Sequence, residues 1–81
     1  MYNKIITDVW ERVELINGRV SIQNINDGGE AYVKLMDTET SPNKDDIGAI
    51  ISPKEIATYT DDGNFIYIRC SKNYNLNVVI W

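Results

Sequence analysis

The sequence predicts an all-β protein, a small antiparallel β-sandwich or barrel of about seven short strands. The first observation is compositional, because 12 Ile, six Val and five Thr stand against three Leu and three Ala in 81 residues. β-Branched side chains lose rotamer freedom in helices and pack well on pleated sheets. The second observation is spacing: apolar runs recur roughly every ten residues between segments rich in Asn, Asp and Gly, as in small sandwiches.

The first two expected strands are residues 10–16 and 19–25, which are joined by Asn17-Gly18. Asn-Gly between β-rich runs is the strongest short-range hairpin signal, because both central residues of a type I′ turn need a positive φ. We therefore expect these two strands to form a hairpin.

A helix over residues 8–16 is the alternative for the first of these strands. Asp8 and Glu11 have the spacing of a capping box, and apolar residues such as Val9 and Val13 recur at helical intervals. Both interpretations stay open at this point.

Five further segments read as strands, because they are short apolar runs or alternate between apolar and polar residues. They are residues 30–36, 47–51, 55–60, 65–71 and 76–81. An Asp-Gly turn at residues 61–64 predicts that the segments on either side of it form a second hairpin.

Alternation also assigns faces to the last two strands. In the first of them, Tyr67 and Arg69 should point outward, and Ile66, Ile68 and Cys70 inward. In the second, Leu76, Val78 and Ile80 share one face. Residues 73–81 contain no charge, so nothing would protect this last strand if it lies at a sheet edge.

Residues 37–46 contain no aliphatic residue and form the longest break in the apolar pattern. The 36 residues before this break and the 35 after it are each too few to build a core, so we expect one domain, residues 1–81, with a surface loop. Acidic side chains in such a loop lack the rigid placement that a catalytic carboxylate pair needs; they are Asp37, Glu39, Asp45 and Asp46.

The residue types argue against an enzyme. There is no His, so the side chain best suited to proton transfer at neutral pH and to zinc binding is absent. The single Cys70 cannot form an internal disulfide, and its inward face predicts a buried structural thiol. We expect no catalytic residue, no metal and no cofactor.

Charge and hydropathy limit the classes of partner that we expect for this chain. A net charge of -4 argues against nucleic-acid binding, which gains affinity from basic surfaces. No apolar run approaches the roughly 18 residues of a membrane-spanning helix. An 81-residue chain buries only about 63% of its unfolded surface, so we expect part of its stability to come from assembly.

The aromatic residues are the best candidates for an interface, because a chain of this size cannot bury all of them and aromatic side chains suit protein contacts. For each Trp, capping one end of the core is an equally good interpretation. The predicted interface residues are Trp10, Tyr32, Tyr67, Tyr74, Val79 and Trp81.

Several segments together resemble small virion proteins of tailed bacteriophages. The resemblance starts with Val20-Ser21-Ile22-Gln23-Asn24-Ile25, a short loop and Ala31-Tyr32-Val33-Lys34-Leu35. It continues through Gly48, Ser52-Pro53-Lys54-Glu55, Phe65-Ile66-Tyr67-Ile68-Arg69-Cys70-Ser71 and Leu76-Asn77-Val78-Val79. The pattern covers most of residues 9–81. Two segments, 27–29 and 37–46, are longer and more charged than the pattern requires.

This resemblance implies a β-sandwich in the virion, made in the host cytoplasm, that binds other capsid or tail proteins and forms a homo-oligomer. It is compatible with a head decoration or accessory protein, a head-fibre subunit or a tail component. Two other functions remain open. One is a carbohydrate-binding module whose aromatic residues stack on sugars, and the other is a small acidic inhibitor of a host protein.

Overall fold

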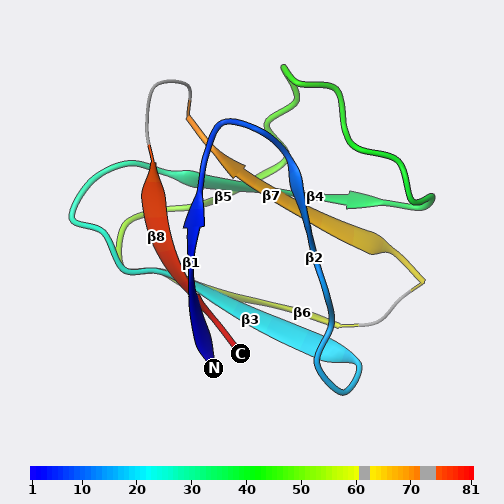
Figure 1. Ribbon diagram of the computed structural model, residues 1–81, viewed down its shortest axis with the longest axis horizontal. Coiled ribbons are helices and arrows are strands. Elements are labelled where there is room, and N and C mark those ends of the chain that lie inside the picture. The colour runs from blue at the N-terminus through cyan, green and yellow to red at the C-terminus, as the bar shows by residue number, and fades with distance from the viewer. Residues whose placement is uncertain (61–62, 72–74) are drawn as a thin grey trace.

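The computed structural model describes residues 1–60, 63–71 and 75–81, and these parts of the chain contain strands and no helix. The strands are β1 (Tyr2–Ile6), β2 (Glu11–Val13), β3 (Arg19–Asn24), β4 (Ala31–Met36), β5 (Ala49–Ile51), β6 (Ile56–Thr60), β7 (Phe65–Cys70) and β8 (Leu76–Ile80). They form two four-stranded antiparallel sheets, β1-β8-β3-β6 and β2-β7-β4-β5 (Figure 1). The predicted all-β class is confirmed, and the two sheets make the fold a sandwich.

Strands from the first half of the chain pair with strands from the second half in reverse order. β1 pairs with β8, β2 with β7, β3 with β6 and β4 with β5. Further pairing of β3 with β8 and of β4 with β7 wraps this ribbon into two sheets. The resulting strand order is that of a jelly roll. Because Tyr2 pairs with Ile80, the two ends of the chain lie side by side (Figure 1).

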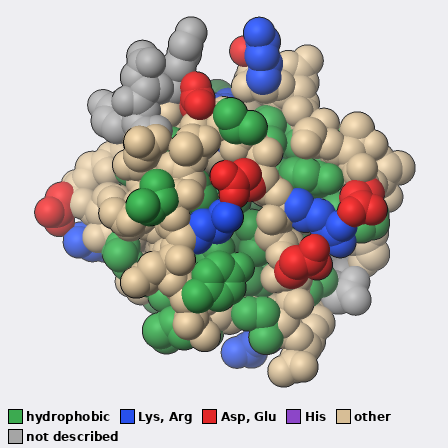
Figure 2. Space-filling view, viewed as in Figure 1, with side chains coloured by type: hydrophobic (Ala, Val, Ile, Leu, Met, Phe, Trp, Pro, Cys, Tyr) green, Lys and Arg blue, Asp and Glu red, His purple; other side chains and the backbone are tan. Residues whose placement is uncertain are grey.

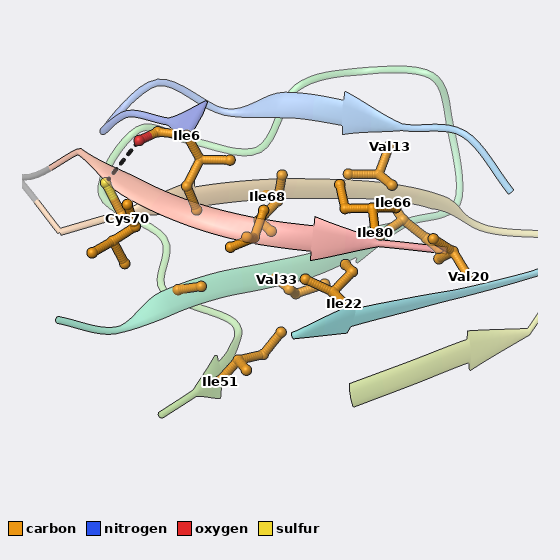
Figure 3. Packing of buried hydrophobic residues seen from close by; sticks show 13 residues of the cluster. Ile6, Val13, Val20, Ile22, Val33, Ile51, Ile66, Ile68, Cys70 and Ile80 are labelled. Atoms are coloured by element: carbon orange, nitrogen blue, oxygen red, sulfur yellow. Dashed lines mark hydrogen bonds between the residues drawn. The ribbon is translucent and has the colours of Figure 1, made fainter. Parts of the chain in front are cut away.

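Side chains that point inward from both sheets form the core (Figure 3). In β8, Leu76, Val78 and Ile80, which the alternation places on one face, are all buried, whereas Asn77 between them is exposed. Burying one such aliphatic side chain contributes about 1.5–3 kcal/mol. The other members of the core are Ile6, Val13, Val20, Ile22, Ala31, Val33, Ile51, Ile66, Ile68 and Cys70.

The fully buried side chain of Asn24 is a polar link between the sheets. From β3 its Nδ2 donates to the carbonyl oxygen of Ile51 in the opposite sheet, at 3.1 Å, and to that of Gly29, at 3.0 Å. Its Oδ1 accepts hydrogen bonds from the backbone N–H and the Nδ2 of Asn26. Asn26 in turn bonds the backbone of Asn77 at the exposed edge of this network. All four hydrogen-bonding positions of the Asn24 amide are therefore used.

Gly48 allows the chain to enter β5 close to β4. Its φ is 71°, and a Cβ at this position would overlap the carbonyl oxygen of Val33. Both the left-handed conformation and the close approach require glycine.

The Asn17-Gly18 turn is present, but the hairpin predicted around it is wrong. Both residues have the positive φ that the turn needs, 52° and 80°. Only the single bridge between Ile16 and Arg19 joins the two arms. Beyond it, β2 enters one sheet and β3 the other, because each must turn its apolar face toward the common core.

The second predicted hairpin is also wrong, because β6 pairs with β3 whereas β7 lies in the other sheet between β2 and β4. Asp61 and Asp62 of its predicted turn lie outside the described residues. The last strand does not lie at a sheet edge either. β8 is an inner strand between β1 and β3, and this position buries its uncharged sequence.

The N-terminal segment differs from the sequence prediction in two ways. β1 is an eighth strand that the sequence pattern does not indicate, since Asn3 and Lys4 interrupt its apolar residues and pairing with β8 defines it. The helix considered over residues 8–16 is absent, and β2 lies there instead.

We expect Asn24→Ala to lower the free energy of unfolding by about 3 kcal/mol, because the change leaves buried backbone carbonyls without a donor. The matched control is Asn3→Ala on the exposed side of β1, which should cost less than about 0.5 kcal/mol. Urea unfolding followed by Trp fluorescence measures both. Equal losses in the two variants would contradict the structural role of Asn24.

Candidate binding site

An open groove of about 670 Å³ lies on the outer face of the β2-β7-β4-β5 sheet. One wall is the segment between β1 and β2, and the other is the segment between β4 and β5, drawn in green in Figure 1. Its size falls within the range of small-molecule sites. The lining residues are Asp8, Val9, Trp10, Tyr32, Ser41, Pro42, Lys44, Asp45, Ile47, Arg69 and Ser71.

The guanidinium of Arg69 lies between two aromatic rings in this groove. Its central carbon is 5.0 Å from the ring centre of Trp10 and 4.7 Å from that of Tyr32. Only 7% of Arg69 is exposed, and among the described residues no carboxylate forms an ion pair with it. Attraction between the cation and the two ring faces therefore offsets part of the cost of burying this charge.

Backbone carbonyls satisfy the donors of Arg69. Nη2 and Nε donate to the carbonyl oxygen of Asp46, at 2.6 and 3.2 Å, and Nη1 donates to that of Cys70, at 3.1 Å. Because Asp46 belongs to the loop between β4 and β5, Arg69 attaches this loop to the sheet.

Hydrogen bonds from Trp10 and Lys34 also hold the same loop. Nε1 of Trp10 donates to the carbonyl oxygen of Asn43 at 2.9 Å. Nζ of Lys34 donates to Oδ2 of Asp46 at 2.8 Å, and this hydrogen bond keeps the pKa of the Asp46 carboxyl below its usual value. The loop that the sequence predicts over residues 37–46 thus covers part of one sheet instead of extending into solvent.

The groove offers both donors and acceptors to a ligand. Ser41 and Ser71 contribute hydroxyl groups, Lys44 an ammonium, and Asp8 and Asp45 carboxylates. This mixture suits a neutral, polar ligand better than a strongly charged one. The rings of Trp10 and Tyr32 offer a ligand only part of their surface, however, because Arg69 lies over a face of each.

In the described parts of the chain, acidic side chains of the loop and Cys70 make contacts of their own. No group of three His, Cys, Asp or Glu side chains there is placed to hold a metal ion. In the acidic loop, Glu39 pairs with Arg12 and Asp46 with Lys34. Cys70 is buried, its Sγ donates to the carbonyl oxygen of Ile6, and burial raises the pKa of the thiol. The last finding agrees with a structural Cys70.

The structure separates the predicted interface residues. Trp10 and Tyr32 both line the groove, on either side of Arg69, whereas Val79 and Trp81 belong to the other sheet. Tyr74 lies outside the described residues. Tyr67 points away from the core as predicted but is only 5% exposed, because Arg12 and Lys34 flank it on the two neighbouring strands.

Arg69 was not among the predicted interface residues, although it contacts both aromatic rings of the groove. Alternation correctly directs it outward, but it is buried because Trp10, Tyr32 and the loop cover it. The available signal is a single charge within the apolar run of β7.

The outer face of the β1-β8-β3-β6 sheet has a different character, and we call it the open face. Ile5 and Ile56 on it are 63% and 56% exposed. The four strands of this sheet contain no acidic residue, and Arg19, the first residue of β3, is the one charged residue of these strands that lies on the open face. Its other members are Asn3, Ser21, Gln23, Thr58, Thr60, Asn77, Val79 and Trp81, as the strand pairing shows.

Comparison with protein-family models, with curated proteins and with solved structures finds no match to this chain. The described residues form no helix that is long and apolar enough to cross a membrane. The features of the chain that bear on its function are therefore the two outer faces, one partly covered by a loop and one open.

We expect Arg69→Lys to lower the free energy of unfolding by about 1–3 kcal/mol. Lysine keeps the charge but cannot lie flat between two rings or donate from two nitrogens to one carbonyl. Hydrogen exchange at the Asp46 amide should also become faster, because this amide bonds Asn43 within the same loop.

The matched control is Arg12→Lys, because Arg12 also lies over a ring, that of Phe65 at 4.8 Å, but about a third of its side chain is exposed. This control should cost less than about 0.5 kcal/mol. Urea unfolding and amide exchange by NMR compare the two variants. Unchanged exchange in the loop of Arg69→Lys would contradict the attachment.

Proposed function

We propose that this chain is a non-enzymatic structural subunit of a tailed-bacteriophage virion and acts by binding other virion proteins. The open face carries the proposal. It presents exposed Ile5 and Ile56 beside half-buried Val79 and Trp81, and its four strands contain none of the 12 acidic residues of the chain. Depletion of charge together with apolar and aromatic side chains is typical of the centre of protein–protein interfaces.

Two further observations support this role. The sequence resembles small virion proteins over most of its length, and these act by assembly. Eight-stranded jelly rolls are used as viral capsid domains, although they also serve as lectins, so the fold is an analogy and carries less weight. Within the particle, we favour a decoration or accessory subunit of the capsid, or a head-fibre subunit.

The test is incorporation into particles of the phage that encodes the chain. We expect mass spectrometry of gradient-purified particles to detect the wild-type chain, and Ile5→Lys to reduce its copy number at least tenfold, because a charge then enters the open face. The matched control is Val9→Lys, since Val9 is 64% exposed but lies outside this face. Absence of the wild-type chain from purified particles would reject the proposal.

Carbohydrate binding is the second candidate, and the groove favours it. Sugar sites combine an aromatic surface with hydroxyl, carboxylate and amino groups, and the groove places Tyr32 near Ser41, Ser71 and Asp45. The stacking of Arg69 on Tyr32 leaves less ring surface for a sugar.

For this second candidate, we expect a glycan array to show binding that Tyr32→Ala abolishes. Tyr2→Ala, a change on β1 in the other sheet, should leave the same binding intact. An array without any signal for the wild-type chain would remove carbohydrate binding from consideration.

An inhibitor that imitates nucleic-acid phosphates finds less support, because it needs a continuous acidic surface. On the side pictured in Figure 2, acidic side chains lie beside basic ones with hydrophobic side chains between them. Ion pairs such as Lys4–Glu11 and Lys34–Asp46 illustrate this mixing.

A further inference from the structure

Each sheet of the sandwich has two edge strands, and three of the four edges carry features that prevent pairing with another chain. On β1, Lys4 points toward the neighbouring sheet and forms an ion pair of 2.6 Å with Glu11 of β2. β2 has only three residues, two of them charged. β5 also has three residues and is followed by Ser52-Pro53. Charge, shortness and nearby proline are the usual protections of an edge.

β6 is the fourth edge, and none of these protections lies within the strand itself. Its five residues, Ile56–Thr60, include no charge, no Pro and no Gly. It pairs with β3 on one side, and the described residues place no strand on its other side. An uncharged and unpaired edge is a template for another strand.

The hydrogen bonds of β3 show which backbone groups of β6 are unpaired. Ser21 exchanges both of its backbone hydrogen bonds with Trp81, on the side away from β6. Its direct partner Thr58 therefore turns its own N–H and C=O away from β3, toward the edge. Because the pattern alternates along the strand, the N–H and C=O groups of Ile56 and Thr60 also point toward the edge. The hydrogen bond from the Asn24 N–H to the Glu55 carbonyl oxygen fits this alternation, since Glu55 then points its carbonyl toward β3.

We propose that β6 pairs antiparallel with β6 of a second copy of this chain, across a two-fold axis at Thr58. The β1-β8-β3-β6 sheets of the two copies then form one continuous sheet. The outward N–H and C=O groups of Ile56, Thr58 and Thr60 all find partners in the copy. This proposal deepens the assembly role proposed above and rests on it, since it names a second copy as one partner.

The strand is complementary to itself, which is why a second copy is the partner we choose. In this register Ile56 lies opposite Thr60 of the copy, and Thr58 lies opposite Thr58, so no charged residue of the strand meets another. Tyr59, whose ring is half-buried at the rim of the core, lies opposite the small Ala57. Two-fold contacts place like residues together, and like charges across an interface cost several kcal/mol.

The sequence around β6 makes the dimer sensitive to salt. Glu55 precedes the strand, and the sequence continues after Thr60 with two Asp residues. Because like charges flank the paired segment, we expect added salt to strengthen dimerisation by screening their repulsion.

Sedimentation equilibrium of the purified full chain tests the proposal. We expect the wild type to dimerise and Thr58→Pro to raise the dimer dissociation constant at least tenfold, because proline removes an outward N–H without removing a hydrogen bond to β3. The matched control is Thr58→Ala, which also loses the 2.9 Å hydroxyl contact with Ser21 but keeps the N–H. This control should dimerise like the wild type.

Two additional measurements keep the test decisive if Thr58→Pro folds poorly. Thr58→Lys keeps the N–H but sets two charges against each other at the axis, so its dimer should be at least tenfold weaker in low salt and recover in 1 M salt. In the wild type, amide exchange at Ile56, Thr58 and Thr60 should slow with rising protein concentration, whereas exchange at Val79 on the inner strand β8 should not change.

A wild-type chain that stays monomeric at about 1 mM would overturn this inference. Equal dimer dissociation constants for Thr58→Pro, Thr58→Lys and Thr58→Ala would overturn it as well. Neither result affects the virion proposal, which depends on Ile5 and on the presence of the chain in particles. Conversely, Ile5→Lys should dimerise normally, because Ile5 lies on β1 at the opposite edge of the same sheet.

Discussion

The burial of one apolar face of each sheet against the other is the constraint on which the rest of this structure depends. With 81 residues there is one such layer, and Figure 3 shows both sheets contributing to it. Of the connections between successive strands, only that from β4 to β5 stays within one sheet. Asn24 is the polar exception inside this layer, and it is tolerated because every hydrogen-bonding position of its amide is used.

The outer faces of the two sheets differ, because a loop covers part of one of them and the other is open. On one sheet, Arg69, Trp10 and Lys34 attach the polar loop between β4 and β5, which occupies part of the face and forms a groove. Among the described residues, no such loop covers the open face of the other sheet, and its edge strand β6 has no charge. This difference is the reason why the proposed contacts with other virion proteins are placed on the open face.

Local patterns predicted part of the fold and part of the candidate site. The alternation in β8 placed Leu76, Val78 and Ile80 on one face, which the structure buries, and Asn17-Gly18 identified a true turn. The same patterns misassigned both hairpins, since a tight turn reverses the chain but does not determine whether the next strand joins the same sheet. For the site, Trp10 and Tyr32 were predicted, whereas the burial of Arg69 and Tyr67 depends on covering segments distant in the sequence.

The sequence alone determined the β class, the inward face of β7, the shared face of Leu76, Val78 and Ile80 in β8, and the absence of His chemistry. Composition, a period of two and residue identity are local properties, which is why a single stretch of sequence reveals them. Only the tertiary structure decided which strands are neighbours. It placed the uncharged β8 inside a sheet and left β6 at an edge. The physical reason is that strand partners are selected by the joint burial of two faces, a condition that spans the whole chain and has no signature within any single strand.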